Sequence, residues 1–155
     1  MMTQPQPRRQ PRRARDWSAS MSSSSGPALD LRFRASIEAV PVARHSLGRW
    51  LAELDIDRTI RDELALVVTE LVTNAVEASP GPHHEVALRA SCDDDGIHMV
   101  IVDEGDGFAL TGSVDTPEPT AIRGRGLPIV QALMDAVSVE RRDQRTVVTA
   151  RRTIT

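Results

Sequence analysis

The sequence predicts an α+β domain built as a two-layer sandwich, in which a mixed, mostly antiparallel sheet is covered on one face by about three helices. Short segments of alternating apolar and polar residues predict the strands, and longer segments with apolar residues at helical spacing predict the helices. Tight turns at Asp95-Gly96 and Asp143-Gln144 indicate hairpins. Strands in one layer and helices in the other give this two-layer sandwich.

The first predicted elements are one strand and two helices. Residues 31–38 alternate apolar and polar side chains, which predicts a half-buried strand. A helix is expected from about Pro41, because proline is tolerated in a first helical turn. After a polar break at residues 55–57, a second helix is expected over about residues 59–78, and the Ser-Pro-Gly-Pro segment 79–82 ends it. Its apolar residues follow the helical period: Leu64, Val67, Val68, Leu71, Val72 and Ala75.

The second half of the chain predicts two hairpins separated by a loop and a helix. Residues 86–92 alternate as a strand, and residues 97–103 return as its hairpin partner. Residues 104–124 are rich in glycine and show no periodicity, which is typical of a functional loop or lid. A third helix is expected over about residues 127–135. The chain then closes with two strands, at residues 136–141 and 146–154.

Composition excludes several kinds of chemistry. The chain has 155 residues, and all 19 of its Lys and Arg positions are arginine. The absence of lysine excludes a P-loop lysine, the strand lysine of eukaryotic-type protein kinases and Schiff-base chemistry. The single cysteine, Cys92, excludes a disulfide framework and a thiolate zinc site.

Charge is distributed unevenly along the chain. Residues 1–26 carry five Arg and one Asp, a net charge of +4, whereas residues 27–155 carry 14 Arg and 21 acidic residues, a net charge of -7. The Pro-, Gln- and Ser-rich first segment predicts a disordered basic tail, followed by one folded domain over residues 27–155. A nonspecific contact of the tail with nucleic acid, anionic lipid or an acidic partner is the alternative to a solvated extension.

No segment resembles a signal peptide or is long and apolar enough to span a membrane. A cytoplasmic protein without membrane contact is therefore expected. The acidic body argues against specific nucleic-acid binding.

The second helix carries the first candidate site. Glu70 and Asn74 are spaced one helical turn apart, with Thr73 and Glu77 beside them, and this set is expected on the face opposite the apolar stripe. Asparagine is unfavourable inside a helix, and Asn74 is the only asparagine in the chain. A carboxylate and an amide oxygen one turn apart suit a water-organising base and a Mg²⁺ ligand. The alternative is an ordinary solvated helix face.

Two glycine-rich segments are further candidates. Asp103 ends an apolar strand and is followed by Gly105 and Gly107, which permit close approach of a ligand. The Gly-Arg-Gly segment 124–126 opens a helix, where free N–H groups and the helix dipole favour phosphate. Taken singly, these are an ordinary Asp/Gly turn and an ordinary helix start.

In their order and spacing, the three segments resemble a known set. Residues 70–75 resemble the N box, residues 103–108 the G1 box and residues 124–130 the G2 box of the GHKL superfamily, whose ATP-binding domains have the Bergerat fold. The resemblance covers nearly all of residues 31–155. In its minimal length the matching segment is similar to the histidine kinase-like domains of the RsbW and SpoIIAB group. This group comprises the anti-sigma factor serine kinases and their actinobacterial relatives.

The resemblance implies a role for each matching residue. Glu70 matches the general base, Asn74 the Mg²⁺ ligand, and Asp103 the aspartate that accepts a hydrogen bond from the adenine amino group. Thr146 matches the threonine that supports this aspartate, and Arg123 or Arg125 would stabilise phosphate charge in place of a lysine. The residues assigned to ATP and Mg²⁺ binding are Asn74, Asp103, Gly105, Gly107, Gly124, Arg125, Gly126, Leu127 and Thr146.

The resemblance also implies a function. The expected protein binds ATP, transfers its γ-phosphoryl group to a serine or threonine of an anti-anti-sigma-like partner, sequesters a sigma factor and forms a homodimer. Ala78 stands where the group often has histidine, and Arg145 where it usually has glycine. These departures favour an alternative, an ATP-gated binding module that regulates a partner without phosphotransfer.

Overall fold

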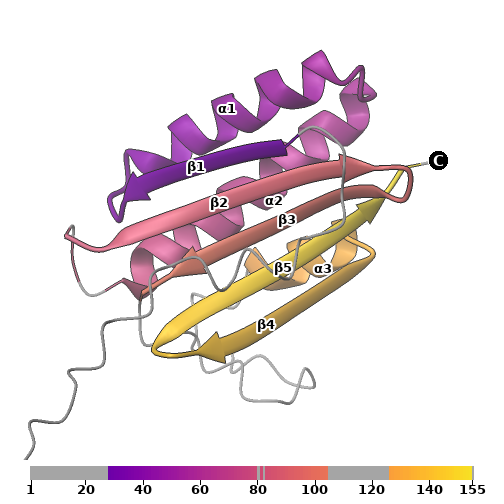
Figure 1. Ribbon diagram of the computed structural model, residues 1–155. Helices are drawn as coiled ribbons and strands as arrows, with labels where there is room; N and C mark the ends of the chain where they lie inside the picture. Colours follow the sequence, from indigo (N-terminus) through magenta and orange to yellow (C-terminus); the bar gives the residue numbers. More distant parts are fainter. Residues whose placement is uncertain (1–27, 80, 82, 105–125, 155) are drawn as a thin grey trace, which may run out of the picture.

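The computed structural model describes residues 28–79, 81, 83–104 and 126–154, and these form one α/β sandwich (Figure 1). Five strands form a sheet in the order β1-β2-β3-β5-β4, and each neighbouring pair is antiparallel. In chain order the elements are β1 (Ala28–Arg34), α1 (Ala39–Glu53), α2 (Arg58–Ala78), β2 (Glu85–Asp93), β3 (Gly96–Asp103), α3 (Gly126–Leu133), β4 (Ala136–Arg142) and β5 (Arg145–Thr153).

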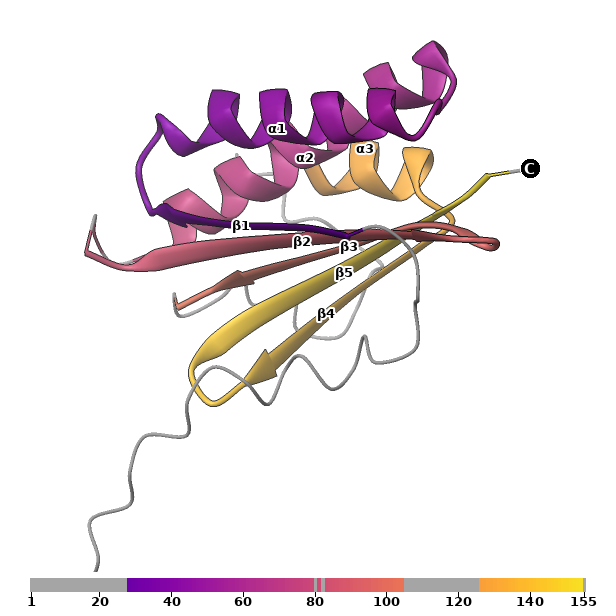
Figure 2. The same cartoon turned by 45° about the horizontal axis from the view of Figure 1, so that its top comes forward.

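The three helices cover one face of the sheet, as the sequence predicted (Figure 2). Alternate residues of the central strands point into this core, including Leu88, Met99 and Ile101, which are at most 1% exposed. Leu64 and Val68 of α2 meet them from the helical layer and are fully buried. Burial of each such side chain contributes roughly 1.5–3 kcal/mol to folding, so the packing of helices on sheet supplies most of the stability.

The first strand ends earlier than its alternating pattern predicts. β1 stops at Arg34, and Ile37, which the pattern places on the buried side, is 65% exposed. The Ser36 N–H donates to the Arg34 carbonyl (2.8 Å) and the Ala39 N–H to the Ser36 carbonyl (3.0 Å), which turns the chain toward α1. The prediction was wrong here because the chain has to leave the sheet to reach the helical layer.

The helix boundaries follow local signals closely. α1 begins two residues before Pro41, which therefore sits in the first turn, where its missing N–H is harmless. α2 begins after Asp57, whose carboxylate accepts a hydrogen bond from the Thr59 N–H (3.0 Å). α3 ends at Leu133, two residues before the predicted end, because Asp135 already donates its N–H to the Arg151 carbonyl of β5 (2.8 Å).

Gly96 generates the first testable prediction. It opens β3 with φ at 142°, and a Cβ placed on it would lie 2.0 Å from the Arg152 carbonyl oxygen on β5. Gly96→Ala should therefore lower the free energy of unfolding by about 2 kcal/mol or more, measured by urea denaturation. Gly48→Ala is the control: a Cβ there meets nothing within 4 Å, and alanine should stabilise α1 by about 0.5–1 kcal/mol. Equal effects of the two substitutions would contradict the geometry.

Candidate functional site

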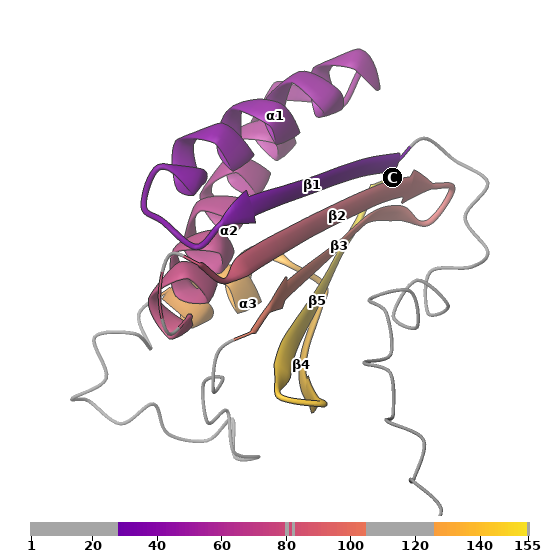
Figure 3. The same ribbon diagram turned by 60° about the vertical axis from the view of Figure 1, so that its left-hand side comes forward.

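The candidate residues collect at one end of the sandwich. β3 ends and β5 begins there, since Asp103 pairs with Thr146. α3 finishes at the opposite end, where Ala136 of β4 pairs with Arg151, which in turn pairs with His98 near the start of β3. The first turn of α3 therefore points toward the end that holds Asp103. The C-terminal part of α2 lies at this end as well (Figure 3).

Asp103 and Thr146 form a buried polar pair across β3 and β5. They are direct partners in the strand register, and each is 1% exposed. The Thr146 Oγ1 is buried and has no hydrogen-bond partner within the described part of the chain. Buried hydroxyl groups are normally hydrogen-bonded, because leaving one unpaired costs about 1–3 kcal/mol. The pair therefore offers a carboxylate and a free hydroxyl to a ligand.

Asn74 occupies a different position on α2 from the one that the sequence predicts. The prediction placed it on the face opposite the apolar stripe, but the residue is only 7% exposed. It lies at the edge of the buried arc, beside Leu71 and Ala75, and Glu70 one turn earlier is half-buried. The reason is that α2 contacts α1, α3 and the sheet, so that neighbours cover more of its circumference than one stripe.

The start of α3 completes the described part of the site. Gly126 is the first residue of this helix, and Leu127 is half-buried. The first N–H groups of a helix have no partner inside it, and they favour anions. Five predicted site residues lie outside the described residues: Gly105, Gly107, Arg123, Gly124 and Arg125.

An ion-pair cluster lies directly beside the buried pair. Glu104 follows Asp103 and Arg145 precedes Thr146, and the Arg145 Nη2 lies 3.9 Å from the Glu104 Oε1. The His84 Nδ1 lies 3.0 Å from the other oxygen of Glu104. Each of these side chains is more than a third exposed, so the ion pairs contribute at most about 1 kcal/mol. From the sequence, Arg145 was noted only as a replacement for glycine. Its contact with Glu104 follows from the strand register, because Arg145 and Glu104 are the chain neighbours of the paired residues Thr146 and Asp103.

The described residues give no support for a reactive thiol or for a cluster of metal-ligating side chains. Burial raises the pKa of the Cys92 thiol, and the carboxylates of Asp93 and Asp94 raise it further, so it stays protonated at neutral pH. Among the residues that the structure describes, no three His, Cys, Asp or Glu side chains gather into a metal-binding group, and no helix is long and apolar enough to cross a membrane.

A sheet end with a buried carboxylate, next to the first turn of a helix, is typical of a nucleotide-binding α+β domain. The chain belongs to the histidine kinase-like ATPase domain family, whose model matches residues 33–152. This match includes the three helices and the strands β2, β3 and β4 in full, the last two residues of β1, and all of β5 except its last residue.

Curated relatives of similar size carry two kinds of name. The anti-sigma F factor of Oceanobacillus iheyensis is 30% identical over 118 residues, which cover 72% of this chain and 81% of the relative. The anti-sigma F factor of Geobacillus stearothermophilus is 30% identical over 119 residues, covering 72% and 82%. The serine-protein kinase RsbW of Bacillus subtilis is 26% identical over 123 residues, covering 72% and 77%.

A solved structure shares the fold. The crystal structure of the RsbU and RsbW domains of a Mycobacterium tuberculosis protein aligns with a TM-score of 0.58 at 22% identity. The alignment covers 83% of this chain and 35% of the solved chain, so this chain spans about a third of that longer protein. The likeness supports the two-layer architecture described above.

The unpartnered hydroxyl of Thr146 generates the second prediction. Thr146→Val keeps the shape of the side chain and removes a polar atom that has no partner in the described residues. The free energy of unfolding without ligand should therefore stay the same or rise by up to about 1 kcal/mol in urea denaturation. A loss of more than about 1 kcal/mol would mean that the hydroxyl is hydrogen-bonded in the folded protein.

Proposed function

We propose that this protein is an ATP-dependent serine/threonine kinase of the anti-sigma factor type. In this proposal it transfers the γ-phosphoryl group of ATP to an anti-anti-sigma-like partner and sequesters a sigma factor in the cytoplasm. The observation that carries the proposal is the buried Asp103–Thr146 pair, at the end of the sandwich that also holds Asn74 and the start of α3. Family membership and the names of the relatives support it.

The buried pair suits the adenine ring. The Asp103 carboxylate would accept a hydrogen bond from the adenine amino group, and the Thr146 hydroxyl, which has no partner among the described residues, would complete the polar contacts. Guanine carries an oxygen in place of that amino group, so a carboxylate at this position would reject it. Asp103 therefore determines the choice of base in this proposal.

The phosphate end of the nucleotide would lie near α2 and α3. Free N–H groups in the first turn of α3 suit phosphate oxygens. The Asn74 amide oxygen on α2 is a hard oxygen ligand of the kind that Mg²⁺ prefers, with water and phosphate oxygens as the others, so the residues present fit this metal. Mg²⁺ bound there would neutralise charge on the triphosphate.

Glu70 is the proposed base. In the proposed step, the hydroxyl oxygen of a partner serine or threonine attacks the γ-phosphorus, and the bond from this phosphorus to the β,γ-bridging oxygen breaks. ADP leaves with the bonding electrons, and the hydroxyl proton passes to the Glu70 carboxylate. Glu70 is half-buried one turn before Asn74, which places base and metal ligand on the same side of α2.

A second candidate function is an ATP-gated binding module without phosphotransfer. Ala78, the last residue of α2, brings no polar side chain to the proposed phosphate end. Arg145, which stands where the resemblance implies a glycine, lies 3.9 Å from Glu104. This candidate predicts ATP affinity and ATP-dependent partner binding with no ADP formed. The homodimer that the resemblance implies stays a prediction, because the structure contains one chain.

The third prediction concerns the metal. In isothermal titration calorimetry with ATP, the wild-type protein should bind more tightly with Mg²⁺ than with EDTA. Asn74→Ala should remove this difference, because it deletes the proposed ligand, and should bind Mg-ATP about tenfold more weakly. Asn74→Asp, which keeps an oxygen ligand, should retain the dependence on Mg²⁺. An unchanged Mg²⁺ effect in Asn74→Ala would contradict the site.

The fourth prediction separates the two candidate functions. Glu70→Gln should leave ATP affinity within about twofold of wild type and slow phosphorylation of a candidate partner by about 10²–10⁴-fold, because it removes the proton acceptor. The measurement is transfer of ³²P from γ-labelled ATP. If wild-type protein binds ATP and the partner but releases no ADP, the binding module is correct and the kinase is not.

A further inference from the structure

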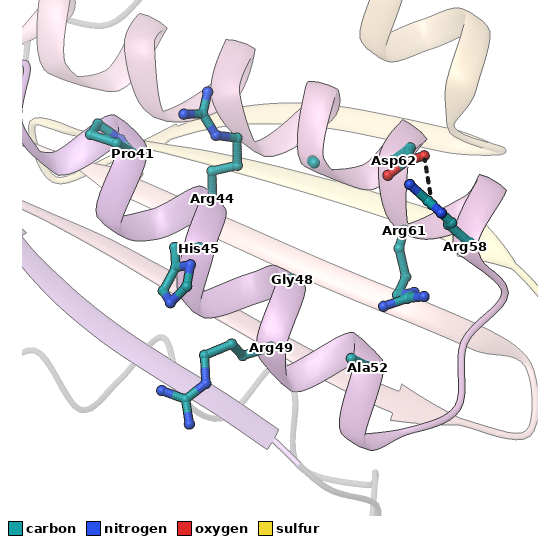
Figure 4. Close-up of a pocket in the computed structure, with 10 residues that line it drawn as sticks. Pro41, Arg44, His45, Gly48, Arg49, Ala52, Arg58, Arg61 and Asp62 are labelled. Atoms are coloured by element: carbon teal, nitrogen blue, oxygen red, sulfur yellow. Dashed lines mark ion pairs between the residues drawn. The ribbon is translucent and has the colours of Figure 1, made fainter.

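A cationic groove runs between α1 and α2 on the side of the helical layer that faces away from the sheet (Figure 4). Its volume is about 650 Å³, within the range of binding sites. It lies outside the candidate nucleotide site and shares no residue with it. The lining residues are Pro41, Arg44, His45, Gly48, Arg49 and Ala52 of α1 and Arg58, Arg61, Asp62 and Ala65 of α2.

The charge of this groove is opposite to that of the domain. Four arginines and one histidine line it, and Asp62 is the one carboxylate among the described lining residues. The Asp62 Oδ2 lies 4.0 Å from the Arg58 Nε, and both side chains are more than three-quarters exposed, so the pair neutralises one charge weakly. Residues 27–155 as a whole carry a net charge of -7. A local cluster of arginine on an acidic domain is a surface suited to an anionic ligand.

Arg61 provides a second, independent observation. Its Nε is buried and has no hydrogen-bond partner among the described residues. In Figure 4 its side chain extends from α2 into the space beside Gly48 and Ala52. A buried N–H of a guanidinium group that lacks an acceptor is unfavourable, and a carboxylate entering the groove would supply one.

The shape of the groove suits a chain segment. Small residues form its floor, namely Gly48, Ala52 and Ala65, and a Cβ added at Gly48 would meet nothing within 4 Å. The stripe from Pro41 to Ala52 is about 16 Å long at 1.5 Å per residue, the length of about five extended residues.

We propose that the groove between α1 and α2 is a docking site for an acidic segment of a partner protein. Carboxylates of this segment pair with Arg58 and Arg61 of α2. The inference deepens the proposed function, because it names the chemistry by which a protein partner is recognised. It does not depend on ATP binding or on phosphotransfer.

The observations favour a peptide over other anions. In Figure 4 the guanidinium groups of Arg44 and Arg61 lie apart along the groove, and that of Arg49 lies on the side of α1 away from α2, so the three do not converge on one phosphate group. A nucleic-acid backbone also carries a charge at every nucleotide beyond the groove, where the net charge of -7 on residues 27–155 repels it, whereas a peptide needs carboxylates only within the groove. Trp50, the one aromatic residue of α1, is 7% exposed and is not available for base stacking.

The experiment uses the full chain and a fluorescein-labelled oligoglutamate peptide, followed by fluorescence anisotropy. The wild-type protein should bind this peptide, and oligoglutamine of equal length should not bind. Arg61→Ala should weaken binding about tenfold, because a charge-assisted hydrogen bond is lost. Gly48→Leu, which fills the groove floor where there is open space, should weaken it at least as much. Circular dichroism checks that both variants are folded.

Arg32→Ala is the matched control, since Arg32 is an exposed arginine on β1, outside the groove. It should bind oligoglutamate like the wild type. Wild-type affinity in both groove variants, an equal loss in Arg32→Ala, or tighter binding of oligothymidylate or tripolyphosphate to the groove would overturn the proposal. Titration of ATP into the same variants separates the docking groove from the proposed kinase function. Groove variants that lose peptide binding and keep ATP affinity support the groove. A wild-type protein that binds the peptide but not ATP contradicts only the proposed kinase.

Discussion

The packing of α2 against the centre of the sheet is the constraint on which the rest of the structure depends. This 21-residue helix contacts α1, α3, β2 and β3, and its buried side chains belong to the one hydrophobic core. An isolated helix of this length is at best marginally stable in water, so its position is maintained by the apolar side chains that it buries. The position of α2 then determines where Glu70 and Asn74 lie relative to the ends of the strands.

Polar groups interrupt this core at one end. The buried polar residues among those described are Asn74, Ser91, Asp103 and Thr146, and three of these four belong to the candidate site. Burying a hydroxyl is unfavourable unless it is hydrogen-bonded, so the Thr146 hydroxyl, which has no partner among the described residues, is the feature of this end that points to a ligand. Ser91 lies on β2 near the hairpin at the other end and is not part of this group.

The two proposed sites lie on different parts of α2. The nucleotide site uses the C-terminal part, where Glu70 and Asn74 lie, and the cationic groove uses the first turns around Arg58 and Arg61. One rigid helix therefore connects a candidate catalytic end with a candidate docking surface. In this arrangement a partner can bind at the cationic groove while a serine or threonine of the same partner reaches the nucleotide site.

The order and type of the elements were determined by the sequence itself. Alternation along β2 and β3, the Asp57 cap, the proline in the first turn of α1 and the tight turn before Gly96 are local signals, and each acts over a few residues. The three motif segments could be assigned to a family for the same reason. Only the tertiary structure decided that Ile37 faces solvent, that Asn74 is buried, that Arg145 meets Glu104, and that arginines of two helices form one groove. These features depend on which surfaces of different elements cover one another. Packing between elements that are distant in the sequence determines this, and the periodicity within a single segment carries no information about it.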